Sequence, residues 1–154
     1  MHRSRLVVSL LVSLVPWGCA ETRQCTLLGC ANEGIDVDFV HTEVGTYSVD
    51  VTVDGTKTTC TATLPLDSSA STYDACTAAG IFLRRSGSSL PADQQAIGGL
   101  KVTSTEAKSI TVKITRDGQV LHDATFAPDY VVTPGPNGPD CEPKECKAAS
   151  FTLP

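Results

Sequence analysis

Four side chains that could bind a metal ion lie close together in the first half of the chain: Asp36, Asp38, His41 and Glu43. Asp36 and Asp38 are two positions apart, so on a β-strand they project from the same face. Carboxylate oxygens from a strand and its adjoining turn suit Ca²⁺, which takes about six to eight oxygen ligands. An amphipathic strand places its solvated residues at the same positions, and no EF-hand loop is present. We therefore expect a solvated strand face and no cofactor, with calcium as the weaker alternative.

Histidine is the commonest general base in enzymes, and beyond residue 18 the chain contains only His41 and His122. No G-x-S-x-G motif marks a nucleophilic serine. The cysteines are better explained as disulfide partners than as nucleophiles. We expect no catalytic residue and classify the chain as a non-enzyme.

The chain has seven cysteines, an odd number that needs an explanation in an exported protein. If Cys19 is set apart, six remain for three disulfides. Zinc is disfavoured because the C-x4-C spacings at the two ends come without a close histidine pair. We expect Cys60 to bond Cys76. We expect two further disulfides to join the N-terminal cysteines, Cys25 and Cys30, to the C-terminal cysteines, Cys141 and Cys146. Which N-terminal cysteine bonds which C-terminal cysteine is left open.

Three side chains of types that often contact ligands on protein surfaces are candidates for binding a partner. Tyr73, in a serine-rich loop, and Tyr130, after Pro128, are candidates for a glycan-binding platform, although a cap over the core is the commoner role of such tyrosines. Lys144 lies between Cys141 and Cys146, where a rigid loop could present it to a protease. More commonly, cysteines in such a segment form disulfides that fix the C-terminal tail to the domain.

The elements that must position these residues are β-strands. Apolar and polar residues alternate through 35–39, 47–53 and 110–114, as expected for strands with one buried face. Asp54-Gly55 and Asp117-Gly118 each separate two such runs, which predicts hairpins over 47–64 and 110–126. Weaker strands are expected at 81–85 and 97–102, and one helical turn at 91–96.

Some seven short strands separated by turns predict a single antiparallel β-sandwich of immunoglobulin-like architecture, stapled by disulfides. We assign 34–154 to this domain, with a Pro/Gly-rich C-terminal tail, and 19–33 to an N-terminal tether. The two hairpins share similar sequences. Two independent hairpins explain this as well as a duplication does.

The N-terminus has the pattern of a signal peptide over residues 1–18. A basic start with Arg3 and Arg5 precedes an apolar run at 6–15, which is shorter than the roughly 20 residues that span a membrane. Gly18-Cys19 then resembles the lipobox of bacterial lipoproteins, in which the cysteine is diacylated and becomes the first mature residue. Pro16 departs from the leucine that this family favours. Cleavage after Ala20, giving a secreted or periplasmic protein, is the alternative.

The charge argues against one class of partner. Removing residues 1–18 removes Arg3 and Arg5 and no acid, so the formal net charge goes from −5 to −7. An acidic domain repels phosphate backbones, and we expect no nucleic-acid partner.

Cys19, Gly29-Cys30, the Asp-Gly hairpins and the stretch Cys141-Glu-Pro-Lys-Glu-Cys146 together resemble the small cysteine-containing lipoproteins of myxobacterial genomes. That resemblance implies an exported β-rich domain in the cell envelope and no particular activity. We expect the lipid anchor to lie in the outer membrane. We expect a structural or interaction role, with an envelope protein or a glycan as partner. A secreted module that binds calcium, a glycan or a protease is the alternative.

Overall fold

The computed structural model describes residues 25–76 and 80–154. The signal peptide over 1–18 and Cys19 lie outside these residues. The described chain is built from β-strands with a single 3-10 turn. In chain order the elements are β1 (Gly34–His41), β2 (Gly45–Val53), β3 (Thr56–Leu64), β4 (Tyr73–Ala75), β5 (Ile81–Ser86), η1 (Ala92–Gln94), β6 (Ala96–Val102), β7 (Ile110–Arg116), β8 (Gln119–Phe126), β9 (Val131–Pro134) and β10 (Glu145–Thr152).

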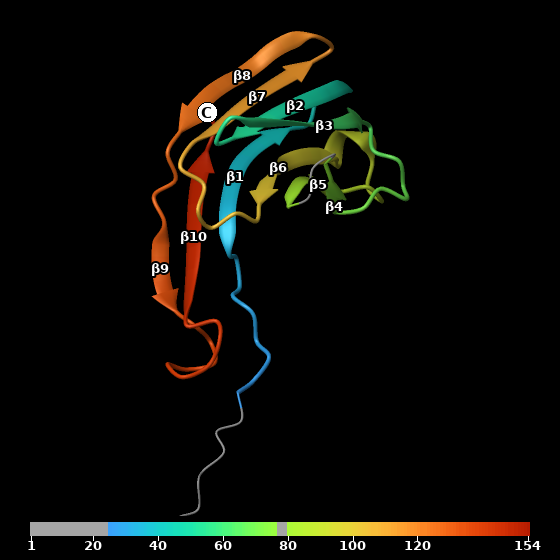
Figure 1. The fold of residues 1–154 in the computed structure, drawn as a ribbon. Coiled ribbons are helices and arrows are strands. Elements are labelled where there is room, and N and C mark those ends of the chain that lie inside the picture. Colours follow the sequence, from blue (N-terminus) through green and yellow to red (C-terminus); the bar gives the residue numbers. More distant parts are fainter. Residues whose placement is uncertain (1–24, 77–79) are drawn as a thin grey trace, which may run out of the picture.

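The strands form two packed sheets, which confirms the predicted β-sandwich (Figure 1). The six-stranded sheet has the order β4-β5-β6-β1-β10-β9, and the four-stranded sheet has the order β3-β2-β7-β8. One pairing departs from the predicted antiparallel arrangement, because β1 runs parallel to β10. The other described strand pairs are antiparallel.

The core lies between the sheets and follows from the alternation in the sequence. Ile35 and Val37 of β1 face Val49 and Val51 of β2 across the sandwich, and all four are fully buried. Burying a side chain of this size stabilises the fold by about 1.5–3 kcal/mol. The residues between them in the sequence, such as Asp36, point to the opposite faces.

Both predicted hairpin turns are present. Asp54 and Gly55 have φ angles of 46° and 87°, and Asp117 and Gly118 have 48° and 84°. Two consecutive residues with positive φ make the turn that matches the twist of the flanking strands. Aspartate tolerates this conformation better than most non-glycine residues, and glycine adopts it freely.

The aspartates of the two turns also dock the hairpins on one another. Oδ1 of Asp54 accepts hydrogen bonds from the backbone N–H groups of Lys108 and Ser109, each at 2.9 Å. Oδ1 of Asp117 accepts one from the N–H of Thr46, also at 2.9 Å. Each turn therefore holds the beginning of the other hairpin, and β2 pairs with β7 between them.

Strands β4, β9 and β10 were not predicted. The largest correction concerns β10, because the segment assigned to a C-terminal tail forms an interior strand between β1 and β9. Its small residues Ala148, Ala149 and Ser150 give little hydrophobic alternation, so only its pairing with β1 and β9 defines it as a strand. The helical turn expected at 91–96 is the 3-10 turn η1.

Three disulfides staple the domain, and the expected pairing is confirmed. Cys60 on β3 bonds Cys76 after β4, which joins the edge strands of the two sheets. The N-terminal segment is bridged twice to the region around the β9–β10 loop. These two bridges are Cys25–Cys141 and Cys30–Cys146.

The three disulfides place the protein in an oxidising, extracytoplasmic environment. Within the described ranges, no helix has the length and apolar character needed to cross a membrane.

Candidate functional site

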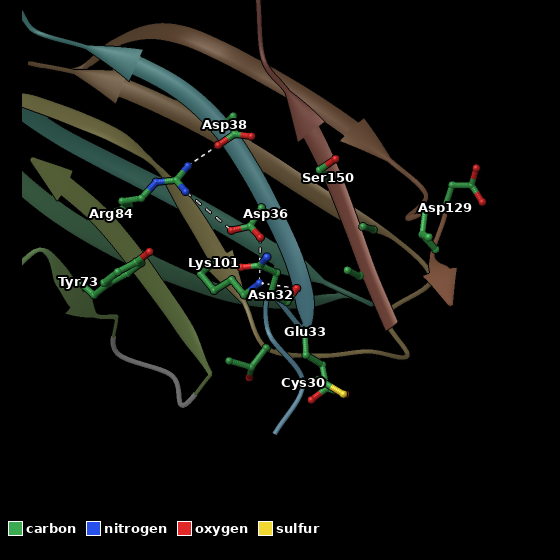
Figure 2. A pocket seen from close by; sticks show the side chains of 14 residues that line it. Cys30, Asn32, Glu33, Asp36, Asp38, Tyr73, Arg84, Lys101, Asp129 and Ser150 are labelled. Carbon is green, nitrogen blue, oxygen red and sulfur yellow. Dashed lines mark hydrogen bonds and ion pairs between the residues drawn. The ribbon is translucent and has the colours of Figure 1, made fainter. Parts of the chain in front are cut away.

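A hollow of about 960 Å³ lies on the outer face of the six-stranded sheet, the face turned away from the four-stranded sheet (Figure 2). Its walls come from β1, β4, β5, β6 and β10, from the N-terminal segment and from the residues around the start of β9. The side chains that define it are Cys30, Asn32, Glu33, Asp36, Asp38, Tyr73, Arg84, Lys101, Asp129, Val131, Ala148 and Ser150.

Strand pairing places three of the lining residues and one glycine in one row across the sheet. Tyr73 pairs with Arg84, Arg84 with Gly99, and Gly99 with Asp38. Because Gly99 has no side chain, the guanidinium of Arg84 passes over it and forms an ion pair with Asp38. Arg84 also donates to the carbonyl oxygen of Gly98, from Nη2 at 2.9 Å and from Nε at 3.2 Å. Its side chain is therefore held flat on the sheet.

A second row lies beside the first. Lys101 pairs with Asp36, and Asp36 pairs with Ser150. Nζ of Lys101 lies 2.9 Å from Oδ2 of Asp36 and donates to the carbonyl oxygen of Asn32 at 3.1 Å. Nη1 of Arg84 lies 3.9 Å from Oδ1 of Asp36, so Asp36 connects the two rows.

This network is only partly exposed. The side chains of Lys101 and Asp36 keep 19% and 28% of their accessible surface. At this exposure solvent and salt screen the attraction less than in a fully solvated pair, while the desolvation of both charges offsets part of the gain. The network also fixes the positions of four charged groups on an otherwise open sheet face.

Small side chains on β10 create the depression. Ala148 and Ser150 point to the outer face, and the hydroxyl of Ser150 is exposed. Val131, paired with Ala148, lies on the rim together with Asp129. The Cys30–Cys146 bridge holds the N-terminal segment against the lower end of the hollow.

The structure does not bring the four predicted metal ligands together. Asp36 and Asp38 lie side by side on β1, but their partners are Lys101 and Arg84. Glu43 forms an ion pair with Arg116. No set of three or more His, Cys, Asp or Glu side chains in the described part of the chain could hold a metal ion. Both aspartates lie on the outer, partly exposed face of β1, as expected for an amphipathic strand, and both are paired with cations.

The two histidines meet at the end of the sandwich, away from the hollow. The ring centroids of His41 and His122 are 5.3 Å apart, and those of His41 and Tyr47 are 5.5 Å apart. Burial lowers the pKa of His41, and the neighbouring His122 and Arg116 lower it further. Neither imidazole lines the hollow.

The two candidate tyrosines differ in the structure. Tyr130 packs against the core, and its hydroxyl lies 3.4 Å from the carbonyl oxygen of Ser104 and 3.3 Å from that of Ala107. Burial raises the pKa of Tyr130. Tyr73 is 51% exposed and lines the hollow. The expected role as a cap over the core therefore fits Tyr130 and not Tyr73.

Lys144 is exposed in the β9–β10 loop, where its carbonyl oxygen accepts a hydrogen bond from Gly135. The flanking Cys141 and Cys146 bond the N-terminal segment and not each other. This geometry supports the alternative role of the segment, in which its disulfides fix the C-terminal region to the domain.

Sequence reasoning did not identify Arg84 and Lys101. Both alternate with buried residues on β5 and β6, so their outward direction followed from the pattern. Their carboxylate partners lie 46 and 65 positions away in the sequence, and only the strand order brings them together.

Comparison of the chain with protein-family models, with curated proteins and with solved structures gives no match.

Proposed function

We propose that this chain is a non-enzymatic, lipid-anchored protein of the cell envelope that acts by binding a partner in the hollow. The observation that carries the proposal is the shape and chemistry of this surface. It is concave, it is lined by an internally paired charge network, and it carries an exposed tyrosine at its edge. Binding sites are typically concave, with a few polar groups held in fixed positions.

The absence of a catalytic role is part of the proposal. A general base or nucleophile needs a free group poised beside the substrate. In the hollow, Asp36 and Asp38 are paired with Arg84 and Lys101, and the histidine pair lies elsewhere. These contacts suit recognition better than proton transfer.

The anchor rests on the lipobox-like Gly18-Cys19 and on the resemblance to small myxobacterial lipoproteins. Cys25 follows Cys19 by six positions, a distance of at most about 20 Å in extended chain. Two acyl chains hold a protein stably at a membrane. An anchor at Cys19 would therefore keep the hollow, whose lower wall includes Cys30, within reach of the outer-membrane surface.

Intact mass of the protein recovered from bacterial membranes tests the anchor, with and without reduction. We expect a mature chain that begins at Cys19 and carries acyl mass, and a gain of six protons when its three disulfides are reduced. The Cys19→Ala variant is the control and should lose the acyl mass and leave the membrane fraction. A chain that begins at Glu21 without lipid would overturn the anchor and favour the secreted binding module.

A further inference from the structure

We propose that the hollow binds a neutral saccharide, a hydroxyl-rich ligand without formal charge. This inference rests on the proposed function, because it names the ligand of the same surface. It is argued from the charge balance of the hollow, from Tyr73 at its edge and from the backbone pairing of the strands beneath it.

The four charged groups in the two rows of the hollow are already matched to one another. Arg84 is engaged by Asp38 and by the carbonyl oxygen of Gly98, and Lys101 by Asp36 and by the carbonyl oxygen of Asn32. A charged group of a ligand placed on these two rows would have to displace one of these partners. A hydroxyl group can donate to a remaining carboxylate lone pair without breaking an ion pair. Asp38 keeps 49% of its side-chain surface exposed for such a contact.

The balance of formal charge also disfavours anionic ligands. Four acids line the hollow against two bases, Arg84 and Lys101. The two acids outside the paired rows are Glu33 and Asp129, which Figure 2 shows at the lower end and at the far side. A uronic acid or a phosphate would approach this surface against a net negative field.

Tyr73 provides the apolar part of a saccharide site. Tyr73 pairs with Arg84 on the neighbouring strand, and Figure 2 shows the hydroxyl end of its ring directed toward the charged rows. Half of the side chain is exposed. Pyranose rings carry an apolar C–H face as well as hydroxyls, so an aromatic face next to hydrogen-bonding groups matches both parts of a sugar.

An extended peptide is a poorer fit. Peptides that add to a sheet use the free backbone groups of an edge strand. The centre of the hollow lies over β5, β6, β1 and β10, each of which has hydrogen-bonded neighbours on both sides. The edge strands β4 and β9 contribute only Tyr73 and Val131, at its rim. The sheet beneath the hollow therefore offers side chains and no free backbone ladder.

The test is an NMR titration of the isotope-labelled domain, with disulfides intact, against a panel of hexasaccharides. The neutral probes are N-acetylchitohexaose, cellohexaose and maltohexaose. The charged probes are hexagalacturonate and a lysine-rich hexapeptide. We expect at least one neutral sugar to shift the amide signals of Tyr73, Gly99 and the outer-face residues of β10, and hexagalacturonate to bind more weakly than that sugar.

Variants assign the binding to the hollow. Tyr73→Ala should raise the Kd for the neutral sugar by about three- to tenfold, the range expected for loss of an aromatic contact, and Tyr73→Phe should restore most of the affinity. Ser150→Trp should fill the depression and abolish binding. Thr63→Trp adds the same bulk at an exposed position of β3 in the other sheet and should leave binding unchanged.

The outcomes separate this inference from the proposed function. If no neutral sugar shifts the amide signals of the hollow but the lysine-rich peptide does, the saccharide proposal is wrong and the hollow remains a binding surface. Shifts from hexagalacturonate as strong as those from the neutral sugar would also overturn the saccharide proposal. If none of the probes shifts these signals, both the ligand and the hollow as a binding surface are refuted.

Discussion

Gly99 shows how a single residue shapes the candidate site. It has a φ of +141°, which favours glycine, and it lies between Arg84 and Asp38 in the first row. A Cβ added there would lie 2.4 Å from Nη2 of Arg84 and 2.6 Å from the carbonyl oxygen of Val37. One of these contacts is with backbone, so the strain could not be relieved by a side-chain movement alone.

Replacing Gly99 with alanine should therefore destabilise the domain by about 1–3 kcal/mol, because it combines steric overlap with an unfavourable backbone conformation. Gly98→Ala is the matched control, since a Cβ at the preceding residue meets nothing within 4 Å. It should change the free energy of unfolding by no more than about 0.5 kcal/mol. Urea unfolding of the two variants measures the difference, and equal losses would show that the row has no special need for glycine.

The histidine pair makes stability depend on pH. His41 has an ordinary pKa of 6.5 in the unfolded chain and a lower pKa when folded. The groups facing it are His122, Arg116 and the rings of Phe39 and Tyr47. As the pH is lowered through 6.5, the unfolded state binds more protons than the folded state, so the free energy of unfolding decreases. The decrease levels off once the pH is below the folded pKa.

We expect the urea midpoint of the domain to be lower at about pH 5.5 than at about pH 7.5, a window in which carboxylates remain mostly ionised. His41→Phe keeps an aromatic ring beside Tyr47 and removes the titrating group, so most of this difference should disappear. If the variant lost as much stability across the window as the parent, His41 would not be the group responsible.

At the scale of elements, the two bridges at the base of the molecule form a ladder between two segments. Cys25–Cys141 and Cys30–Cys146 both join residues 116 positions apart. Once either bridge is formed, the other closes a ring of only about twelve residues. The loop-entropy model then predicts that the two contributions are not independent.

Removing one bridge as a Cys→Ser pair should lower the free energy of unfolding by about 3 kcal/mol, the value for closing the small ring, whichever bridge is removed. Removing both should lower it by about 8 kcal/mol, because the loop of more than a hundred residues is then also open. Chemical denaturation of the three variants measures this coupling. A double loss equal to the sum of the single losses would contradict the ladder.

The hairpins show the same interdependence within the four-stranded sheet. The backbone groups that Asp54 and Asp117 bind belong to the beginning of the opposite hairpin, so each turn orders two elements at once. The sequence similarity of the hairpins thus corresponds to equivalent contacts in space.

At the scale of the whole molecule, the hollow on the outer face of the six-stranded sheet reaches the N-terminal segment at one end of the sandwich, where Cys30, Asn32 and Glu33 line it. Figure 1 shows the described N-terminal residues and the β9–β10 loop together at this end, with the C-terminus at the other. A lipid at Cys19, six positions before Cys25, would therefore be attached near the wall of the hollow that includes Cys30. This arrangement would favour a partner that lies close to the membrane.

The sequence alone determined the β class, both hairpins and the presence of three disulfides. These features depend on local rules: alternation along a strand, positive φ at Asp-Gly, and the even set of six cysteines after Cys19. The burial of Ile35 and Val37 with Asp36 on the opposite face follows from the same alternation.

Only the tertiary structure decided what the outward residues of the six-stranded sheet do. The alternation that directs Asp36 and Arg84 outward does not specify that β5 lies two strands from β1, and that order converts solvated acids into a paired network. It also makes β10 an interior strand, although its small residues carry almost no strand signal of their own. The physical reason is that strand pairing depends on backbone hydrogen bonds between distant segments, which the local pattern of side chains does not encode.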